Sequence, residues 1–295
     1  MLETLGYYNL VGAVIVFLYG SLVGSFLNVV IYRLPLERSI VLPGSACGTC
    51  GTPLRWWENI PILAYFFLGG RCRVCGSSYS CRYAALEALT AFISVYLYHF
   101  YNGLNWQFFY AFVFFCLLLV VFFTDFDHWI ILDSVVYTGM AFGTLFGYFV
   151  PARGDFYFFD YSLVPPFLQH YQDIGSPWLN VLSSVYGMVW GAAFYWSIQC
   201  IGRWIVKQEA MGGGDIKLAA MIGAFLGWHI GILSYFMSFV LGAAVSVIMM
   251  IISKKRGRDP IPLGTFMAVS AFVCLLYSEQ VVSFLVNWSM HGYSY

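Results

Sequence analysis

The sequence predicts an all-α polytopic membrane protein, because apolar segments fill most of the chain and charged residues are scarce. Of its 295 residues, 61% are hydrophobic and 9% are charged, against about 25% charged in an ordinary soluble domain. A soluble globule of this length could not cover so much apolar surface with polar groups. We therefore expect lipid to be the main solvent of this chain, and the bilayer to be its partner.

Eight segments have the composition of transmembrane helices, which need about 20 consecutive apolar residues. They cover residues 8–32, 83–101, 106–124, 130–150, 178–202, 214–229, 231–252 and 261–287. The sixth is short and rich in glycine, so its boundary with the seventh, at Gly227–Gly231, is the least sharply defined. The first is too long for the apolar core of a signal peptide and lacks a basic residue before it, so we expect an uncleaved helix.

Eight spans divide the chain into three parts and fix its orientation. Residues 1–32 form the first helix, residues 33–82 a polar insertion, and residues 83–295 a seven-helix domain with an external loop at 151–177. With the insertion in the cytoplasm, Arg153 is the one basic residue left outside, as the retention of positive charge on the cytoplasmic side requires. Both termini then lie outside. The formal net charge is zero, so nucleic acid is not expected as a partner.

The insertion carries two CxxC pairs, each followed by glycine. The four cysteines are Cys47, Cys50, Cys72 and Cys75. Two residues between cysteines allow a tight turn to point both sulfurs at one ion, and four thiolates form a closed tetrahedral site for structural Zn²⁺. Redox-active thiols and a catalytic zinc ion are the alternatives. Metal binding would also supply folding energy that so small a segment cannot obtain from a core.

Two aspartates lie where apolar spans begin or end. Asp125 follows the third span, and Asp215 precedes the sixth. An ionisable group inside a span costs about 2.5–3.5 kcal/mol, so its presence indicates function. Both acids lie at the predicted cytoplasmic membrane edge, where they can face each other across a bundle. The residues before the second acid are Gly212, Gly213 and Gly214.

These glycines let a substrate backbone or a neighbouring helix approach the carboxylate closely. Lys217 would stabilise Asp215 further if its ammonium group reached that carboxylate, although residues two apart on a helix do not face each other. Structural roles remain open for the acids: Asp215 is a good helix N-cap, and Asp125 and Asp127 could be solvated loop acids.

The order of these motifs resembles that of the bifunctional type IV prepilin peptidases, almost from end to end. The matching segments are Gly24–Pro35, the two CxxC pairs, Asn59–Pro61, Gly70–Cys72, Arg82–Tyr83 with Glu87, Asp125–Asp133 and Gly212–Lys217. This chain departs from the usual pattern at Leu132, where the family has proline, at Pro262–Phe266, and in the length of segment 151–177.

The resemblance implies an intramembrane aspartic protease with Asp125 and Asp215 as its catalytic pair. It implies cleavage of the leader peptide of type IV prepilins or type II secretion pseudopilins at the cytoplasmic face of a bacterial inner membrane. It also implies N-methylation by S-adenosylmethionine, for which Asn28, Arg82 and Glu87 are the candidate residues. The alternative from another class is a non-enzymatic transporter or secretion-assembly scaffold that uses the zinc module for docking.

Overall fold

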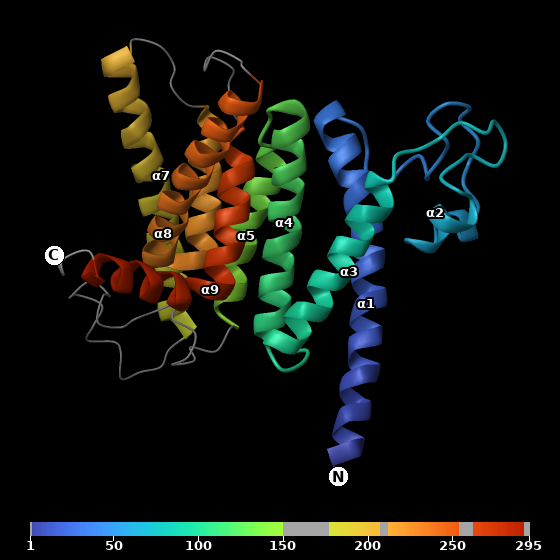
Figure 1. Cartoon of the computed structure of the whole chain (residues 1–295), viewed down its shortest axis with the longest axis horizontal. Coiled ribbons are helices and arrows are strands. Elements are labelled where there is room, and N and C mark those ends of the chain that lie inside the picture. The colour runs from blue at the N-terminus through green and yellow to red at the C-terminus, as the bar shows by residue number, and fades with distance from the viewer. Residues whose placement is uncertain (1, 150–176, 207–211, 254–261, 292–295) are drawn as a thin grey trace. The chain divides into compact units, whose positions relative to one another are not determined.

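The computed structural model describes residues 2–149, 177–206, 212–253 and 262–291 (Figure 1). In these residues the regular secondary structure is helical, apart from two isolated β-bridges. The prediction of an all-α protein is therefore confirmed for this part of the chain. The predicted external loop lies almost wholly outside the described residues, as do Lys207 and the basic segment 254–258.

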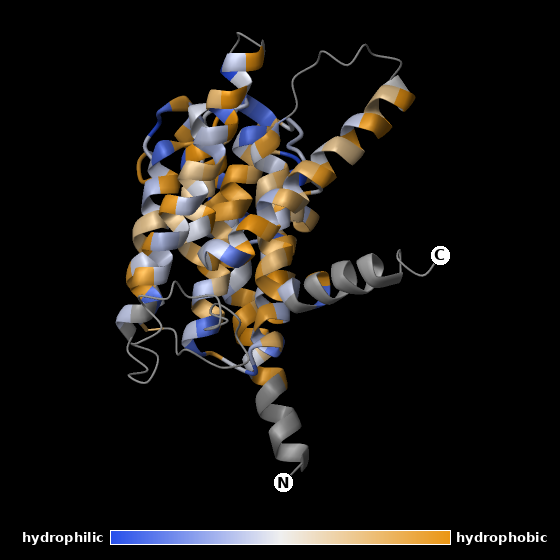
Figure 2. Cartoon of the chain, turned by 90° about the vertical axis from the view of Figure 1, so that its left-hand side faces the viewer, coloured by the Kyte–Doolittle hydropathy of each residue, from blue (hydrophilic) through white to orange (hydrophobic). Residues whose placement is uncertain are grey.

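Seven long helices and three short ones make up the described structure. The long helices are α1 (Leu2–Arg33), α3 (Arg82–Phe100), α4 (Trp106–His128), α5 (Asp133–Gly147), α7 (Pro177–Val206), α8 (Gly213–Ser253) and α9 (Leu263–His291). The short helices are η1 (Leu34–Leu36), η2 (Trp56–Asn59) and α2 (Leu63–Phe67). Apolar residues cover much of the long helices (Figure 2), as a lipid environment requires.

Four of the described helical segments are long and apolar enough to cross a bilayer. They are Leu10–Leu36, Trp106–His128, Asn180–Ile205 and Gly213–Ile251, and a shorter apolar helix covers Leu263–Ser278. These segments support a multi-pass membrane protein. They do not establish eight separate spans, because the described parts of the predicted second and fourth spans, 83–101 and 130–150, contain no such segment, and the sixth and seventh fall in one continuous segment.

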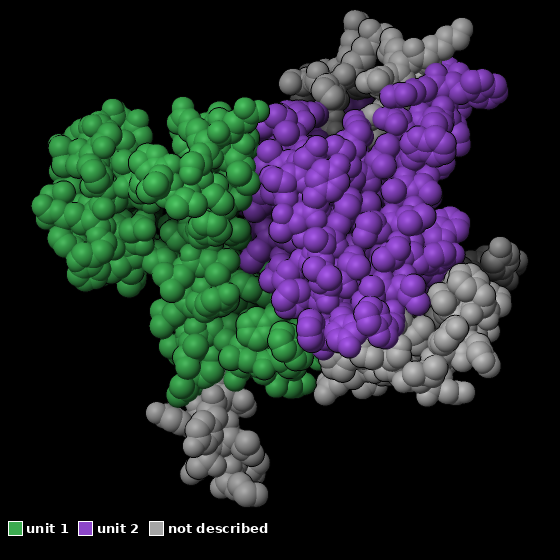
Figure 3. All heavy atoms as spheres, turned by 180° about the vertical axis from the view of Figure 1, so that it is seen from behind, with its two compact units in different colours: residues 1–112 green, residues 113–295 purple. Residues whose placement is uncertain are grey.

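The chain forms two compact units, residues 1–112 and residues 113–295 (Figure 3). In the first unit, α1 packs along α3. A Cβ atom added to Gly24 would lie 2.8 Å from the Cα atom of Glu87, so only glycine permits this approach. Small residues at a helix crossing let two backbones pack closely in a membrane.

Helix α8, in the second unit, turns back on itself at Gly227. The hydroxyl of Tyr235 donates a hydrogen bond of 2.7 Å to the carbonyl oxygen of Ala219, 16 residues away. In a straight helix these residues would be about 24 Å apart along the axis. Gly227 has φ 69° and ψ −179°, a conformation that breaks the helix and that glycine adopts without steric cost. The break falls at one edge of the predicted boundary, Gly227–Gly231.

Two helix boundaries differ from those predicted near the acids. Helix α4 continues to His128, so Asp125 lies in its last turn and not in a loop after it. Helix α5 begins at Asp133, three residues later than expected. The intervening turn contains Trp129 in the left-handed region, with φ 59°. These boundaries decide which way the acidic side chains point.

Candidate active site and zinc centre

The carboxylate of Asp125 is held by the start of another helix. Asp125 is only 5% exposed, and its Oδ2 accepts a hydrogen bond of 2.9 Å from the backbone N–H of Thr265. The N–H of Gly264 also donates to this carboxylate. The first N–H groups of a helix have no partner within the helix and carry partial positive charge, so the start of α9 is a good site for an anion.

The site requires glycine at position 264 for reasons of space. A Cβ atom at this position would lie 2.9 Å from the Oδ2 of Asp125 and 3.2 Å from the Cδ1 of Ile131. Sequence reasoning did not assign Gly264 or Thr265 to the site. A signal was present, because Pro262 followed by Gly264 and Thr265 at the head of an apolar run is typical of a helix N-terminus.

Asp215 enters the same region from the first turn of α8. It is half-buried, and its backbone N–H bonds to the carbonyl oxygen of Gly212 at 3.3 Å. A Cβ atom on Gly214 would lie 3.0 Å from the Cβ of Ile131, the same side chain that packs against Gly264. Ile131 therefore packs against a glycine next to each acid, which places Asp125 and Asp215 in one region, where the ends of α4, α8 and α9 meet.

Lys217 pairs with a different acid from the one considered in the sequence. Its Nζ lies 2.7 Å from both carboxylate oxygens of Asp133, and also near the ring of Tyr137. The reason is geometric, because the side chains of two residues that are two positions apart on a helix point in different directions. Lys217 therefore ties the start of α8 to the start of α5 and does not pair with Asp215.

The four predicted zinc ligands come together in the first unit. Their sulfurs all lie within 4.8 Å of one another, with Cys47–Cys75 at 3.8 Å and Cys50–Cys72 at 3.9 Å. Four sulfurs at about 2.3 Å from a tetrahedral zinc ion would lie about 3.8 Å apart. The donor set therefore fits Zn²⁺. Zinc, when bound, would cross-link two loops that have little core of their own.

The two cysteine loops have the same backbone structure. Cys47 N–H bonds to the Thr52 carbonyl at 2.9 Å, and Cys72 N–H bonds to the Ser77 carbonyl at 2.8 Å. The N–H of Cys50, and after it that of Thr49, lowers the pKa of the Cys47 thiol to about 5. Backbone donors of this kind favour the thiolate that a metal ion requires.

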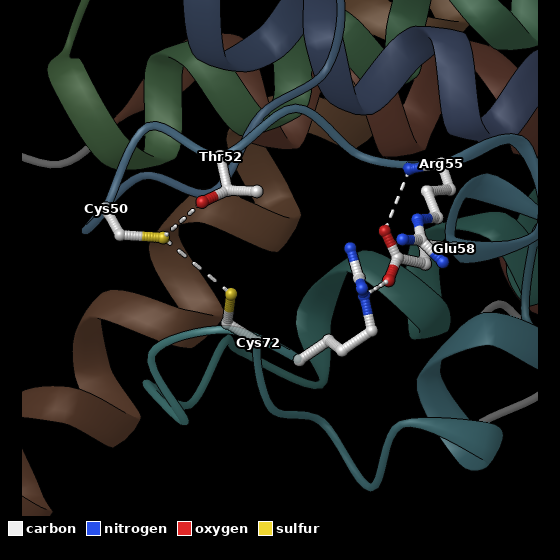
Figure 4. Close-up of polar contacts among 6 residues, drawn as sticks. Cys50, Thr52, Arg55, Glu58 and Cys72 are labelled. Atoms are coloured by element: carbon white, nitrogen blue, oxygen red, sulfur yellow. Dashed lines mark hydrogen bonds and ion pairs between the residues drawn. The ribbon is translucent and has the colours of Figure 1, made fainter.

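Glu58 secures the second cysteine loop to the rest of the insertion. Its carboxylate accepts the Arg55 N–H at 2.8 Å and lies 2.5 Å from the Nε of Arg73 (Figure 4). The Arg55 N–H, followed by the Arg73 guanidinium, lowers the pKa of Glu58. The Glu58 carboxylate is therefore committed to these partners and is not poised as a metal ligand. The sequence alone did not indicate this role.

The three methyltransferase candidates lie near one another but do not all face one space. A cavity of about 810 Å³ in the first unit is lined by Asn28 and Glu87, among others, whereas Arg82 is not part of its lining. The amide of Asn28 donates to the Tyr83 carbonyl at 3.0 Å. The Oε2 of Glu87 accepts the N–H of Ile62 at 2.7 Å.

Fold and site define a class: a polytopic membrane protein with an acid pair at converging helix ends and a four-cysteine centre in a polar insertion. Two family models match the chain. The bacterial peptidase A24 N-terminal domain covers residues 18–101, and the type IV leader peptidase family covers residues 112–247.

Relatives match over nearly the whole chain. A prepilin leader peptidase/N-methyltransferase of Pseudomonas aeruginosa is 32% identical over 95% of this chain and 96% of its own length. The protein of that name from Stutzerimonas stutzeri is 30% identical over 90% of each chain. The one from Myxococcus xanthus is 34% identical over 85% of this chain and 67% of its own. No solved structure matches.

The chain belongs to the type IV leader peptidase family, and it is an enzyme. This finding sets aside the non-enzymatic transporter or scaffold.

Proposed function

We propose that this enzyme cleaves the leader peptide of prepilins with Asp125 and Asp215 as its catalytic pair. The observation that supports it best is the shared surroundings of the two acids: Asp125 is fixed by the N–H of Thr265 at 2.9 Å, and Ile131 packs against both Gly264, next to Asp125, and Gly214, which precedes Asp215. The names of the relatives, which describe prepilin leader peptidases, support the substrate class. Pseudopilins, with the same arrangement of leader and apolar helix, are included in the proposal.

The chemistry follows from two like charges in a confined site. Two neighbouring carboxylates cannot both ionise easily, so the pair holds one proton between them. The ionised member takes a proton from water, which attacks the scissile carbonyl, and the protonated member donates a hydrogen bond to the developing oxyanion. The two residues act as one coupled unit, so neither is assigned alone as the base.

The proposed topology places this reaction where lipid ends. Eight spans with both termini outside put the acid pair and the cysteine insertion on the cytoplasmic side of the inner membrane. The turn at Gly227 supports the division of α8 into the sixth and seventh spans, because it reverses the chain direction. A prepilin with its leader in the cytoplasm and its apolar helix in the bilayer would present its scissile bond at this depth.

A second proposed activity is methylation of the new N-terminus, again in line with the relatives' names. When bound, S-adenosylmethionine supplies the methyl group: the lone pair of the neutral terminal amine forms the N–C bond, the S–C bond breaks with its electrons staying on sulfur, and the amine proton leaves to water. An α-amino group has a pKa of about 7.7–8.0, so a neutral fraction exists near neutral pH. Asn28, Arg82 and Glu87 are the proposed residues.

The peptidase proposal is tested with purified full-length protein and a prepilin, with the mass of the substrate as the readout. Asp125→Asn and Asp215→Asn should each lower the cleavage rate by about 10⁴-fold, the upper range for loss of a positioned acid or base. Asp127→Asn is the matched control, since this nearby acid is exposed; it should cleave normally. Wild-type cleavage by either of the first two variants contradicts the assignment.

A further inference from the structure

The cavity in the first unit combines a carboxylate with aromatic walls. It has a volume of about 810 Å³, within the range of about 300–1,000 Å³ found for small-molecule sites. Tyr65, Tyr79 and Tyr83 contribute to its lining, and the rings of Tyr65 and Tyr79 pack edge to face with centroids 5.6 Å apart. Tyrosine faces attract organic cations.

The carboxylate of this cavity belongs to Glu87, which lies on α3. Its side chain accepts hydrogen bonds from the N–H of Ile62, at 2.7 Å, and from Ser25. Within the described ranges, no ion pair involves Glu87. The other acid in the lining, Glu58, is already paired with Arg73. A half-buried carboxylate without a cationic partner is costly, and a positively charged ligand would offset that cost.

The arginines of the cavity do not neutralise Glu87. Arg33 donates to the carbonyl oxygens of residues 39, 43 and 44 at 2.8–3.2 Å, and Arg73 is held by Glu58. Arg71 is exposed at the lining. It therefore remains available for an anionic part of a ligand, such as the carboxylate of an amino acid.

The backbone that contacts Glu87 is strained. Ile62 has φ 64° and ψ −55°, and the N–H of Leu63 bonds to the carbonyl of Pro61 at 2.6 Å. This is a γ-turn of the rare form, and a β-branched residue at positive φ is an outlier. Such strain is concentrated at functional sites, where the surrounding structure enforces it. The carboxylate of Glu87 accepts a hydrogen bond from the N–H of Ile62 in this turn. The turn and Ser25 together therefore fix the position of the carboxylate.

We propose that this cavity binds the cationic group of the methylation substrates and that Glu87 is its counter-charge. The inference rests on the methylation activity proposed above. Two sources share this chemistry: the sulfonium of S-adenosylmethionine and the terminal ammonium of the cleaved pilin. Transfer of the methyl group leaves S-adenosylhomocysteine, which is neutral at sulfur, so a counter-charge for the sulfonium favours the methyl donor over its product.

The test measures binding by titration calorimetry with the full-length protein in detergent. Glu87→Gln should lower the affinity for S-adenosylmethionine by about tenfold and the affinity for S-adenosylhomocysteine by less than about twofold. Only the first ligand loses a charge–charge contact. Glu87→Asp keeps the charge and should retain the preference. Glu37→Gln is the matched control: this glutamate is exposed and lies outside the cavity lining, so both affinities should be unchanged.

The outcomes separate the two sources and the two proposals. If donor binding is unchanged in Glu87→Gln but the KM for a mature pilin peptide rises by about tenfold, the ammonium is the bound group. An equal loss for both nucleosides, or no loss in either assay, overturns the role of Glu87. Failure of the wild-type protein to bind S-adenosylmethionine overturns this inference and the methylation proposal together. Prepilin cleavage, measured in parallel, should be normal in Glu37→Gln and reports separately on the acid pair.

Discussion

The cysteine centre and the acid pair are assembled over very different distances along the chain. In the cysteine centre, sulfurs in contact are separated by 22 and 28 residues, and each loop repeats the same local hydrogen bonds. In the acid pair, Asp125 is held by Thr265, 140 residues away. The first centre is built from local turns whose four sulfurs could hold one metal ion, whereas the second depends on the packing of the membrane helices.

The largest expected effect comes from removing one metal ligand. Cys72→Ser should abolish zinc binding and with it the order of residues 33–82, since structural zinc contributes about 10–16 kcal/mol of apparent binding free energy in small domains. Zinc analysis and limited proteolysis measure this. Prepilin cleavage should fall far less than in Asp125→Asn if the two centres are built independently.

Cys81→Ser is the matched control for this variant, because Cys81 is exposed and lies outside the four-sulfur cluster. It should keep full zinc content. Zinc retained in Cys72→Ser, or cleavage lost as completely as in Asp125→Asn, would break the comparison between a locally built centre and a packed one.

A smaller effect is expected where helix packing positions the acid. Gly264→Ala brings a methyl group to 2.9 Å from the Oδ2 of Asp125, so either the carboxylate or the start of α9 must shift. A misplacement of about 1 Å can reduce a rate by about 10²-fold, and kcat for prepilin cleavage should fall by about 10–100-fold. Gly242→Ala, whose new methyl would lie 3.5 Å from Phe266, should cleave normally. Equal rates for the two variants would show that the fit around Asp125 is loose.

The smallest effect is expected at the Lys217–Asp133 ion pair. Both side chains are partly exposed, at 36% and 56%, and pairs of this kind contribute about 0–1 kcal/mol. Lys217→Gln should lower Tm by no more than about 2–4 °C, as measured by thermal unfolding in detergent. The double variant with Asp133→Asn should be no less stable than the sum of the single variants predicts. A much larger loss would mean that the pair positions the start of α8.

The sequence was informative where local spacing determines the chemistry. Two CxxC pairs predict four converging sulfurs because the turn is set within each pair, and the structure confirms that convergence. Apolar runs predict most helices, and the glycines near Gly227 indicated a break. What could not be predicted depends on contacts between distant segments: the hold of α9 on Asp125, the partner of Lys217 and the ion pair of Glu58. To predict each of these contacts, one must know which distant segments meet, and no local sequence pattern contains that information. The catalytic roles of Asp125 and Asp215 stay a prediction until the variants are measured.

Helix α4 belongs to both units, because residues 106–112 fall in the first and residues 113–128 in the second. Any attempt to express the protein as two separate polypeptides must therefore avoid that boundary, since a cut there would sever a membrane helix and leave backbone groups unpaired in lipid. The turn before the helix, where Asn102 and Gly103 have positive φ, is the better place to divide the gene. It also lies between the two family matches, so a division there would leave each matched region whole.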